Sequence, residues 1–293
     1  MSALSASSRP LQAVGWMVGA TLSFTAMAVA GREAASDLDT FELMLYRSLL
    51  GLVIVVVIGG ARGLLGDVAR SDLGLHGLRN IGHFAGQNLW LFAVATIPLA
   101  QVFALEFTTP LWVALFAPFV LGERWTRPRI IAVILGFLGI LLVAQPGRVE
   151  LSGGVIAAAL AALGFTVSIL STKLLSLRGN STLNILFWMT VMQAVFGLVC
   201  AGYDADITLP DRSNIAFVAI IGLGGLTAHY CITTALSLAP ATIVAPLDFA
   251  RLPLIALVGW AFYGEVVGAV MVIGALLIVG GNLVNVFAEK RTG

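Results

Sequence analysis

The chain alternates long apolar runs with short polar breaks from end to end. Charged residues, glycines and prolines separate ten apolar stretches: 11–31, 41–60, 73–96, 99–121, 128–145, 152–174, 182–200, 213–237, 241–262 and 267–288. A helix rises 1.5 Å per residue, so runs of about 20 residues suit a hydrocarbon core of ~30 Å. The runs are continuous and lack the two-residue alternation of a membrane β-barrel. The pattern therefore predicts an all-α membrane protein with ten transmembrane helices.

One stretch of this pattern occurs twice. Segment 98–123 can be laid over segment 240–265 with a constant offset and no gap. Glu106 then falls on Asp248, and each acid is followed by Phe in the middle of an apolar run. A weaker match at the start of the halves places Arg32 on Lys173. The chain therefore reads as a doubled unit, with halves at 1–150 and 151–293.

The two halves are expected to be inverted relative to each other. Five spans precede the second half, and because five is odd, the second half enters the membrane from the opposite side. Such repeats are related by a pseudo-two-fold axis in the membrane plane, which is the architecture of many secondary transporters. The sequence thus predicts two inverted five-helix repeats around a central cavity.

Composition supports the membrane assignment and excludes several functions. The chain is 59% hydrophobic and 11% charged, against roughly 45–50% and ~25% in soluble domains. A net charge of +1 argues against nucleic acid as a partner. No GxxxxGK[ST] motif is present, so the chain itself is not expected to use ATP. The two cysteines lack CxxC spacing, and neither a metal nor a cofactor is expected.

Arginine and lysine predict the orientation in the membrane. Most of them collect on one side if the N-terminus is inside, so the positive-inside rule places both termini in the cytoplasm. The stretch 11–31 is followed by charges and contains a small-residue pattern, but it is long for a signal peptide. We interpret it as a retained first helix of a multi-pass protein of the bacterial inner membrane.

The arrangement of spans and several short motifs resemble a known family. The ten spans in two halves, the FELMLYR entry to the second span and the GxxGIxL pattern at 136–142 are similar to the EamA branch of the drug/metabolite transporter superfamily. The resemblance covers nearly the whole chain, and the doubled helix ending in Gly-Glu is its most specific part. It implies a cavity lined by spans 1, 3, 4, 6, 8 and 9, with spans 5 and 10 peripheral.

The resemblance also implies a class of function. Family members export amino acids, other metabolites or cationic drugs, and some import riboflavin, nucleotides or S-adenosylmethionine. The leading expectation is export of a small metabolite, best an aromatic or hydrophobic amino acid, by alternating access. Another metabolite, such as a vitamin, a nucleotide derivative or an organic cation, is the alternative. The expected partners are a small-molecule substrate and the lipid bilayer, with the chain as a monomer or homodimer.

Two carboxylates are the first candidates for the chemistry. Glu106 lies eight residues past Pro98, about 12 Å along a helix and near the bilayer midplane. An ionisable group at that depth is costly and usually marks a pathway or a site. Glu106 and Asp248 could each bind a substrate amine or carry a proton. The alternative is a buried ion pair that holds helices together, for which Arg251 stands three residues beyond Asp248.

Arg79 and Arg129, near the starts of their stretches, are counted with the cytoplasmic charges, which leaves Arg47 and Arg251 as the arginines expected inside the membrane. A guanidinium stays charged, so each needs an anionic partner or a wet cavity. Arg251 could receive a substrate carboxylate. Arg47 lies about two turns into the second span, and we expect it to reach the outer surface or to pair between helices.

A polar and aromatic stripe follows one face of the third span. His83, Gln87 and Trp90 stand at helical spacing and are expected to face the cavity rather than lipid. The repeat overlay adds His229 and Tyr230, and Trp16 and Trp112 could add to an aromatic lining. The predicted substrate-binding set combines all the groups discussed at this depth: His83, Gln87, Trp90, Glu106, Phe107, His229, Tyr230, Asp248 and Arg251.

Prolines mark the spans that are expected to move. Pro110, Pro246 and Pro253 interrupt the fourth and ninth spans, where a missing N–H permits bending, so we interpret these helices as gates. Static kinks are the alternative. Glu123 and Glu265 end the same two spans on opposite faces and could latch each gate to basic residues, at under about 1 kcal/mol for a surface pair.

Two other classes of membrane protein fit the sequence less well. An intramembrane lipid-modifying enzyme would need catalytic residues, and HExxH and acid-rich diphosphate motifs are absent. A channel would need a filter or a ring of like charges, and none is evident. We therefore expect a carrier rather than an enzyme.

Overall fold

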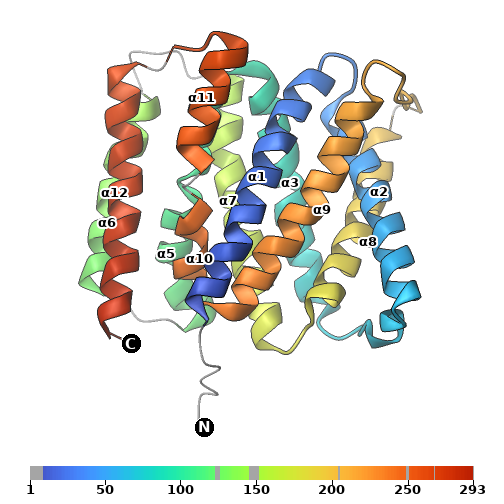
Figure 1. The fold of residues 1–293 in the computed structure, drawn as a ribbon, viewed down its shortest axis with the longest axis horizontal. Helices are drawn as coiled ribbons and strands as arrows, with labels where there is room; N and C mark the ends of the chain where they lie inside the picture. Colours follow the sequence, from blue (N-terminus) through green and yellow to red (C-terminus); the bar gives the residue numbers. More distant parts are fainter. Residues whose placement is uncertain are drawn as a thin grey trace.

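A computed structural model describes residues 9–122, 126–144, 152–203, 205–248, 251–266 and 268–292. Throughout these residues the regular structure is helical (Figure 1). The elements in chain order are α1 (Pro10–Ala34), α2 (Thr40–Ala61), the 3-10 helix η1 (Leu64–Asp67), α3 (Leu73–Thr96), α4 (Leu99–Glu106), α5 (Thr109–Leu121), α6 (Arg127–Ala144), α7 (Gly153–Leu177), α8 (Thr182–Ala201), α9 (Ile215–Leu238), α10 (Ala241–Leu247), α11 (Arg251–Tyr263) and α12 (Ala269–Thr292).

These helices confirm the ten predicted spans, with two of the spans divided. The fourth span consists of α4 and α5, and the ninth consists of α10 and α11. By length and composition, six stretches of the described chain could each cross a membrane: α1, α2, α4 with α5, α7, α8 and α9. The polar stripe of α3 lowers its hydropathy, although its 24 residues would span the core.

A proline explains why the fourth span breaks at the acid. Pro110 occupies the first turn of α5, has no N–H, and its ring would clash with the carbonyl of residue 106 in a continuous helix. The freed carbonyl of Glu106 instead accepts a hydrogen bond from Thr109 Oγ1 at 2.6 Å. The α4 helix therefore ends at Glu106 itself. The second half repeats this arrangement, because α10 ends at Leu247, directly before Asp248.

Figure 1 shows how the helices are arranged around the middle of the bundle. The α6 and α12 helices pack against each other at one edge, and α2 lies against α8 at the other. Between these edges stand α1, α3, α7 and α9 with the divided spans. The α1 helix begins, and α12 ends, at the same face of the bundle. The peripheral position of spans 5 and 10 agrees with the expectation from sequence.

Two basic residues reveal the internal symmetry. Arg32 of α1 donates to the carbonyls of Val94 and Ile97 at the end of α3. Lys173 of α7 donates to the carbonyls of Leu236 and Ala239 at the end of α9, which are the repeat equivalents of those two positions. Because α1 and α7 run in opposite directions, the two contacts lie at opposite ends of the bundle (Figure 1). This is the inverted arrangement that the odd number of spans predicts.

The crossing of α3 and α7 depends on glycines. A Cβ atom added at Gly164 would lie 2.6 Å from the carbonyl oxygen of Gly82 and 2.8 Å from the Cα of Gly86. The two backbones therefore approach each other too closely for any side chain at this position. Such small-residue contacts are a common way for membrane helices to pack tightly.

We expect Gly164→Ala to force α3 and α7 apart and to lower the free energy of unfolding by about 1–3 kcal/mol, as for other overpacked sites. The measurement is unfolding of the purified chain in detergent. Gly77→Ala is the matched control on α3, since nothing lies within 4 Å of a Cβ there. An unchanged stability of the Gly164 variant would contradict the close crossing.

Candidate functional site

A cavity of about 70 Å³ lies between the two halves. It is lined by α1, α3, the divided fourth and ninth spans, α7 and α9, which are the spans that the sequence analysis predicted. The lining side chains are Phe24, Met27, Arg79, His83, Gln87, Trp90, Glu106, Phe107, Thr109, Pro110, Phe165, Ser168, Ile169, Thr172, His229, Ile232, Leu236, Asp248 and Arg251. The breaks in the fourth and ninth spans bring Glu106 and Asp248 to its wall.

The two acids share one guanidinium. Arg251 Nη2 lies 2.5 Å from Glu106 Oε1 and 2.5 Å from Asp248 Oδ2, and its side chain is 1% exposed. In their ionised forms the three groups carry a net charge of −1. The ion pair proposed between Asp248 and Arg251 is thus present, and it extends to the first half of the chain. The acids act as scaffold and cavity wall at once, because both also line the free space.

Aromatic rings hold the guanidinium in place. Arg251 Cζ lies 4.8 Å from the ring centres of Phe24 and Phe103 and 5.4 Å from that of Phe107. Cation–π contacts of this kind are worth about 2 kcal/mol or more where water is excluded. Trp90 Nε1 donates to Glu106 Oε2 at 2.6 Å, so the second oxygen of the acid is also occupied. Among the residues that the structure describes, Asp248 Oδ1 and Arg251 Nε have no hydrogen-bond partner.

A chain of hydrogen bonds crosses the middle of the bundle. Arg47 can only donate, so the oxygen of Gln193 faces Arg47 Nη1 at 3.3 Å, and Gln193 Nε2 donates to His83 Nδ1 at 2.7 Å. His83 Nε2 in turn lies 2.7 Å from His229 Nε2. With both rings neutral, His83 donates to His229. His229 lines the cavity, and its Nδ1–H is then a buried donor without a partner in the described part of the chain.

Two arginines are more deeply buried than a position at the membrane surface would allow. Arg47 is 4% exposed, and its bond to Gln193 of α8 corresponds to the alternative of a contact between helices. A Cβ at Gly225 would lie 2.2 Å from Arg47 Nε. Arg79, which the orientation analysis counted with the cytoplasmic charges, is 1% exposed and lines the cavity. Hydropathy alone does not reveal this, because Arg79 stands near the start of α3, where a charge commonly reaches the aqueous phase.

The predicted stripe on α3 is oriented as expected. His83, Gln87 and Trp90 all line the cavity, and so do Glu106, Phe107, His229, Asp248 and Arg251. Tyr230 does not: it is 45% exposed and packs edge-on against Trp16 on the outside of the bundle. Its neighbour His229 faces inward, and because adjacent helical residues point about 100° apart, Tyr230 is turned away from His229 toward the exterior. Placing Tyr230 in the site was therefore wrong.

Other aromatic and gating residues are divided between the cavity and the exterior. Trp112 stacks on Phe116 and meets Phe137 of α6, so it does not line the cavity. Pro110 lines the cavity at the break in the fourth span. Pro246 falls within α10 and Pro253 within the first turns of α11. Whether these prolines serve as gates stays a prediction.

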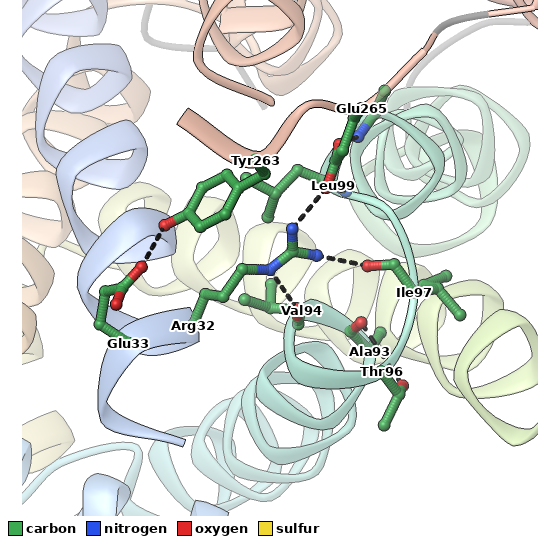
Figure 2. Close-up of polar contacts among 10 residues, drawn as sticks. Arg32, Glu33, Ala93, Val94, Thr96, Ile97, Leu99, Tyr263 and Glu265 are labelled. Atoms are coloured by element: carbon green, nitrogen blue, oxygen red, sulfur yellow. Dashed lines mark hydrogen bonds and ion pairs between the residues drawn. The ribbon is translucent and has the colours of Figure 1, made fainter. Parts of the chain in front are cut away.

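Figure 2 shows an ion pair that closes one end of the bundle. Arg32 of α1 pairs with Glu265, which follows α11, while its other nitrogens bond the carbonyls of Val94 and Ile97. Glu265 also accepts from the backbone N–H of Leu99 at 2.9 Å and so caps the start of α4. We name these contacts of Arg32 and Glu265 the outer latch. Glu123, its predicted counterpart, lies outside the described residues.

The outer latch is more buried than the surface ion pair expected from the sequence. The side chains of Arg32 and Glu265 are only 17% and 10% exposed, so water screens the pair weakly. Tyr263 adds a cation–π contact, with Arg32 Cζ 4.9 Å from its ring centre, and its hydroxyl donates to Glu33 at 2.8 Å (Figure 2). Four elements (α1, α3, α4 and α11) are therefore joined at one point.

A family model and individual relatives match nearly the whole chain, and all of them are named as transporters. The model of the EamA-like transporter family matches residues 11–145 and again 152–287. The chain is 28% identical to a riboflavin transporter of Brucella anthropi over 276 residues, which cover 91% of this chain and 95% of that protein. It is 22% identical to an S-adenosylmethionine uptake transporter of Rickettsia conorii, and the match covers 96% of this chain and 94% of that protein.

The fold has a counterpart among solved structures. One crystal structure superposes with a TM-score of 0.71 at 20% sequence identity, covering 96% of this chain and 98% of that one. The ten-span arrangement described above is therefore a known fold.

Proposed function

The chain belongs to the EamA-like transporter family, and from this premise we propose that it is a secondary transporter that moves a small, ring-bearing metabolite by alternating access. The observation that carries the proposal is the cavity between inverted halves, whose wall contains the breaks of the fourth and ninth spans. A central site at discontinuous helices is how such carriers expose one site to two sides. We place the protein in the bacterial inner membrane with both termini in the cytoplasm, as a monomer or homodimer.

The lining of the cavity supports an aromatic substrate. Phe24, Trp90, Phe107 and Phe165 all contribute to the wall. Ring-to-ring contacts are worth about 0.5–1.5 kcal/mol each beyond the area that they bury. The unpartnered N–H of His229 offers a hydrogen bond to an acceptor on the ring. Riboflavin and S-adenosylmethionine, named for two relatives, both contain a fused nitrogen heterocycle.

The aromatic amino acids expected from sequence share the ring and remain a candidate class. The wall offers them an acid for the amine, because Asp248 Oδ1 is unpartnered. Counterflow in proteoliposomes decides between these solutes: riboflavin, S-adenosylmethionine, tryptophan and the aliphatic control leucine are each offered to the purified chain. Exchange of a ring-bearing solute without its chemical conversion supports the proposal. Conversion of a lipid or solute without exchange would point to an enzyme instead.

Trp90 should contribute to affinity for the ring. We expect Trp90→Ala to weaken the binding of aromatic solutes by about tenfold or more, and that of aliphatic solutes by less. The reason is that a ring contact and the hydrogen bond to Glu106 are lost together. Trp90→Phe is the control that keeps a ring and removes only the N–H. The measurement is the half-saturating concentration in counterflow, and equal losses for tryptophan and leucine would speak against an aromatic cage.

A further inference from the structure

The described residues hold one cavity-lining cation that the proposed mechanism does not use. Arg79 of α3 is 1% exposed and forms no ion pair with a described residue. Its Nη1 donates to Asn80 Oδ1 at 2.8 Å and its Nε to Thr172 Oγ1 at 3.3 Å. Its third nitrogen, Nη2, has no hydrogen bond among the described residues. A buried guanidinium normally has a carboxylate partner, so this one lacks a countercharge.

A hydroxyl group contacts the unpaired cation, and a second lines the same cavity. Thr172 of α7 bonds Arg79, and Ser168 stands one turn before Thr172 and also lines the cavity. Thr172 Oγ1 accepts from Arg79, so its own O–H remains free to donate. The guanidinium can only donate, and each hydroxyl can donate as well, so a carboxylate or a phosphate suits this group of side chains.

The distribution of charge along the cavity also favours an anion near Arg79. Glu106, Asp248 and Arg251 together carry a net −1 in their ionised forms, and Trp90 of α3 marks that end by its bond to Glu106. Arg79 stands eleven residues earlier on the same helix, about 16 Å away along its axis. The cavity therefore has a negative end and a positive end, and Arg47, which the structure also leaves without an ion pair, increases the positive field.

A nearby protein carboxylate does not neutralise Arg79. Asp72, directly before α3, is held by Arg178 at 2.6 Å and by Asn180 at 3.0 Å. The hydrogen bonds from Arg178 and Asn180 hold the pKa of Asp72 below its usual value, so this acid is ionised but already engaged. The countercharge for Arg79 has to come from outside the described chain.

We infer that Arg79, with Ser168 and Thr172, is an anion-binding subsite, and that the transported metabolite carries a carboxylate or phosphate group that docks there. This inference rests on the proposed function for the identity of the site, but anion binding can be measured without transport.

The test uses the purified full-length chain with inorganic phosphate and acetate as probes, at constant ionic strength set with chloride. We expect saturable thermal stabilisation of the wild type by the probes. Arg79→Gln should weaken it by about tenfold or more, and Thr172→Val by several-fold, since charge-assisted hydrogen bonds are lost. Arg62→Gln, an exposed arginine that ends α2, is the matched control and should bind as the wild type does.

A second arm compares solutes with and without an anionic group: tryptophan against tryptophanamide, and riboflavin 5′-phosphate against riboflavin. The member of each pair that carries the carboxylate or phosphate should compete better in counterflow, and Arg79→Gln should remove that preference while Arg79→Lys keeps part of it. Anion binding without exchange of any ring-bearing solute would reject the proposed function and keep this inference. No saturable anion binding, or equal binding by the Arg79→Gln and Arg62→Gln variants, would overturn it. If Arg79→Gln does not fold, an unaltered response of Thr172→Val overturns it as well.

Discussion

Replacing Arg251 by alanine is expected to abolish transport and to lower the free energy of unfolding by about 3–5 kcal/mol, the cost of leaving a buried charge without its partner. Arg251 is the cation that Glu106 and Asp248 share, so its loss leaves two carboxylates side by side at the cavity wall. Two like charges that are close enough to share one guanidinium repel each other strongly where the dielectric constant is low. The three rings around the guanidinium would also lose their cation–π contacts.

The measurement pairs detergent unfolding with counterflow. Arg178→Ala is the matched control, because Arg178 also contacts an acid, Asp72, but its side chain is 50% exposed. Exposed pairs contribute about 0–1 kcal/mol, so this variant should remain near wild type. Glu106→Gln should cost less stability than Arg251→Ala, since Arg251 keeps Asp248, and should still impair transport. A stable and active Arg251→Ala protein would show that the charged cluster at the centre is not required.

The second large effect is expected at the outer latch. Glu265→Gln removes the charge that pairs with Arg32 and weakens the cap on α4 at Leu99. Hydrogen bonds to charged groups are worth about 1.5–3 kcal/mol, which corresponds to a shift of roughly 10–100-fold in an equilibrium between two conformations. We therefore expect this variant to open the bundle at the latch end.

Distances between spin labels would report this opening. Ser36, just beyond α1, and Val266, next to Glu265, are both exposed and can carry labels once Cys200 and Cys231 are replaced. The distance between the labels should lengthen in Glu265→Gln. Glu33→Gln is the control, because it removes only the exposed contact with Tyr263. An unchanged distance distribution in Glu265→Gln would mean that the latch does not hold the closed conformation.

Repetition and hydropathy predicted most of the fold. The prolines indicated that the fourth and ninth spans are interrupted, and Pro110 acts on the backbone four residues before it, at Glu106. Arg251 was identified as a partner of Asp248 from its spacing on one helical face. Its bond to Glu106 joins the two halves, and no local spacing encodes a contact between segments so far apart.

The rest of the site depends on the rotation of each helix about its axis. Arg79 was counted with the cytoplasmic charges, and for Arg47 the surface and a contact between helices both stayed open, because hydropathy measures depth along a helix and not direction. Gln193, which fixes the tautomer of His83, went unnoticed as a lone amide in an apolar run. Tyr230 was placed at the cavity for a related reason: the repeat overlay aligns positions along the chain but does not distinguish the inward from the outward face of a helix. An amphipathic signal on α8 could not help, since lipid and protein interior are equally apolar.

The central guanidinium has a consequence for how this chain relates to a dimer of half-length proteins. The repeat overlay sets Arg251 opposite Thr109, so the basic residue belongs to one copy only. Two identical subunits would supply either two such cations or none at the core, whereas this chain supplies one positive charge for two acids. The two conformations proposed for alternating access are therefore not related by exact symmetry, and we expect them to differ in free energy when the cavity is empty.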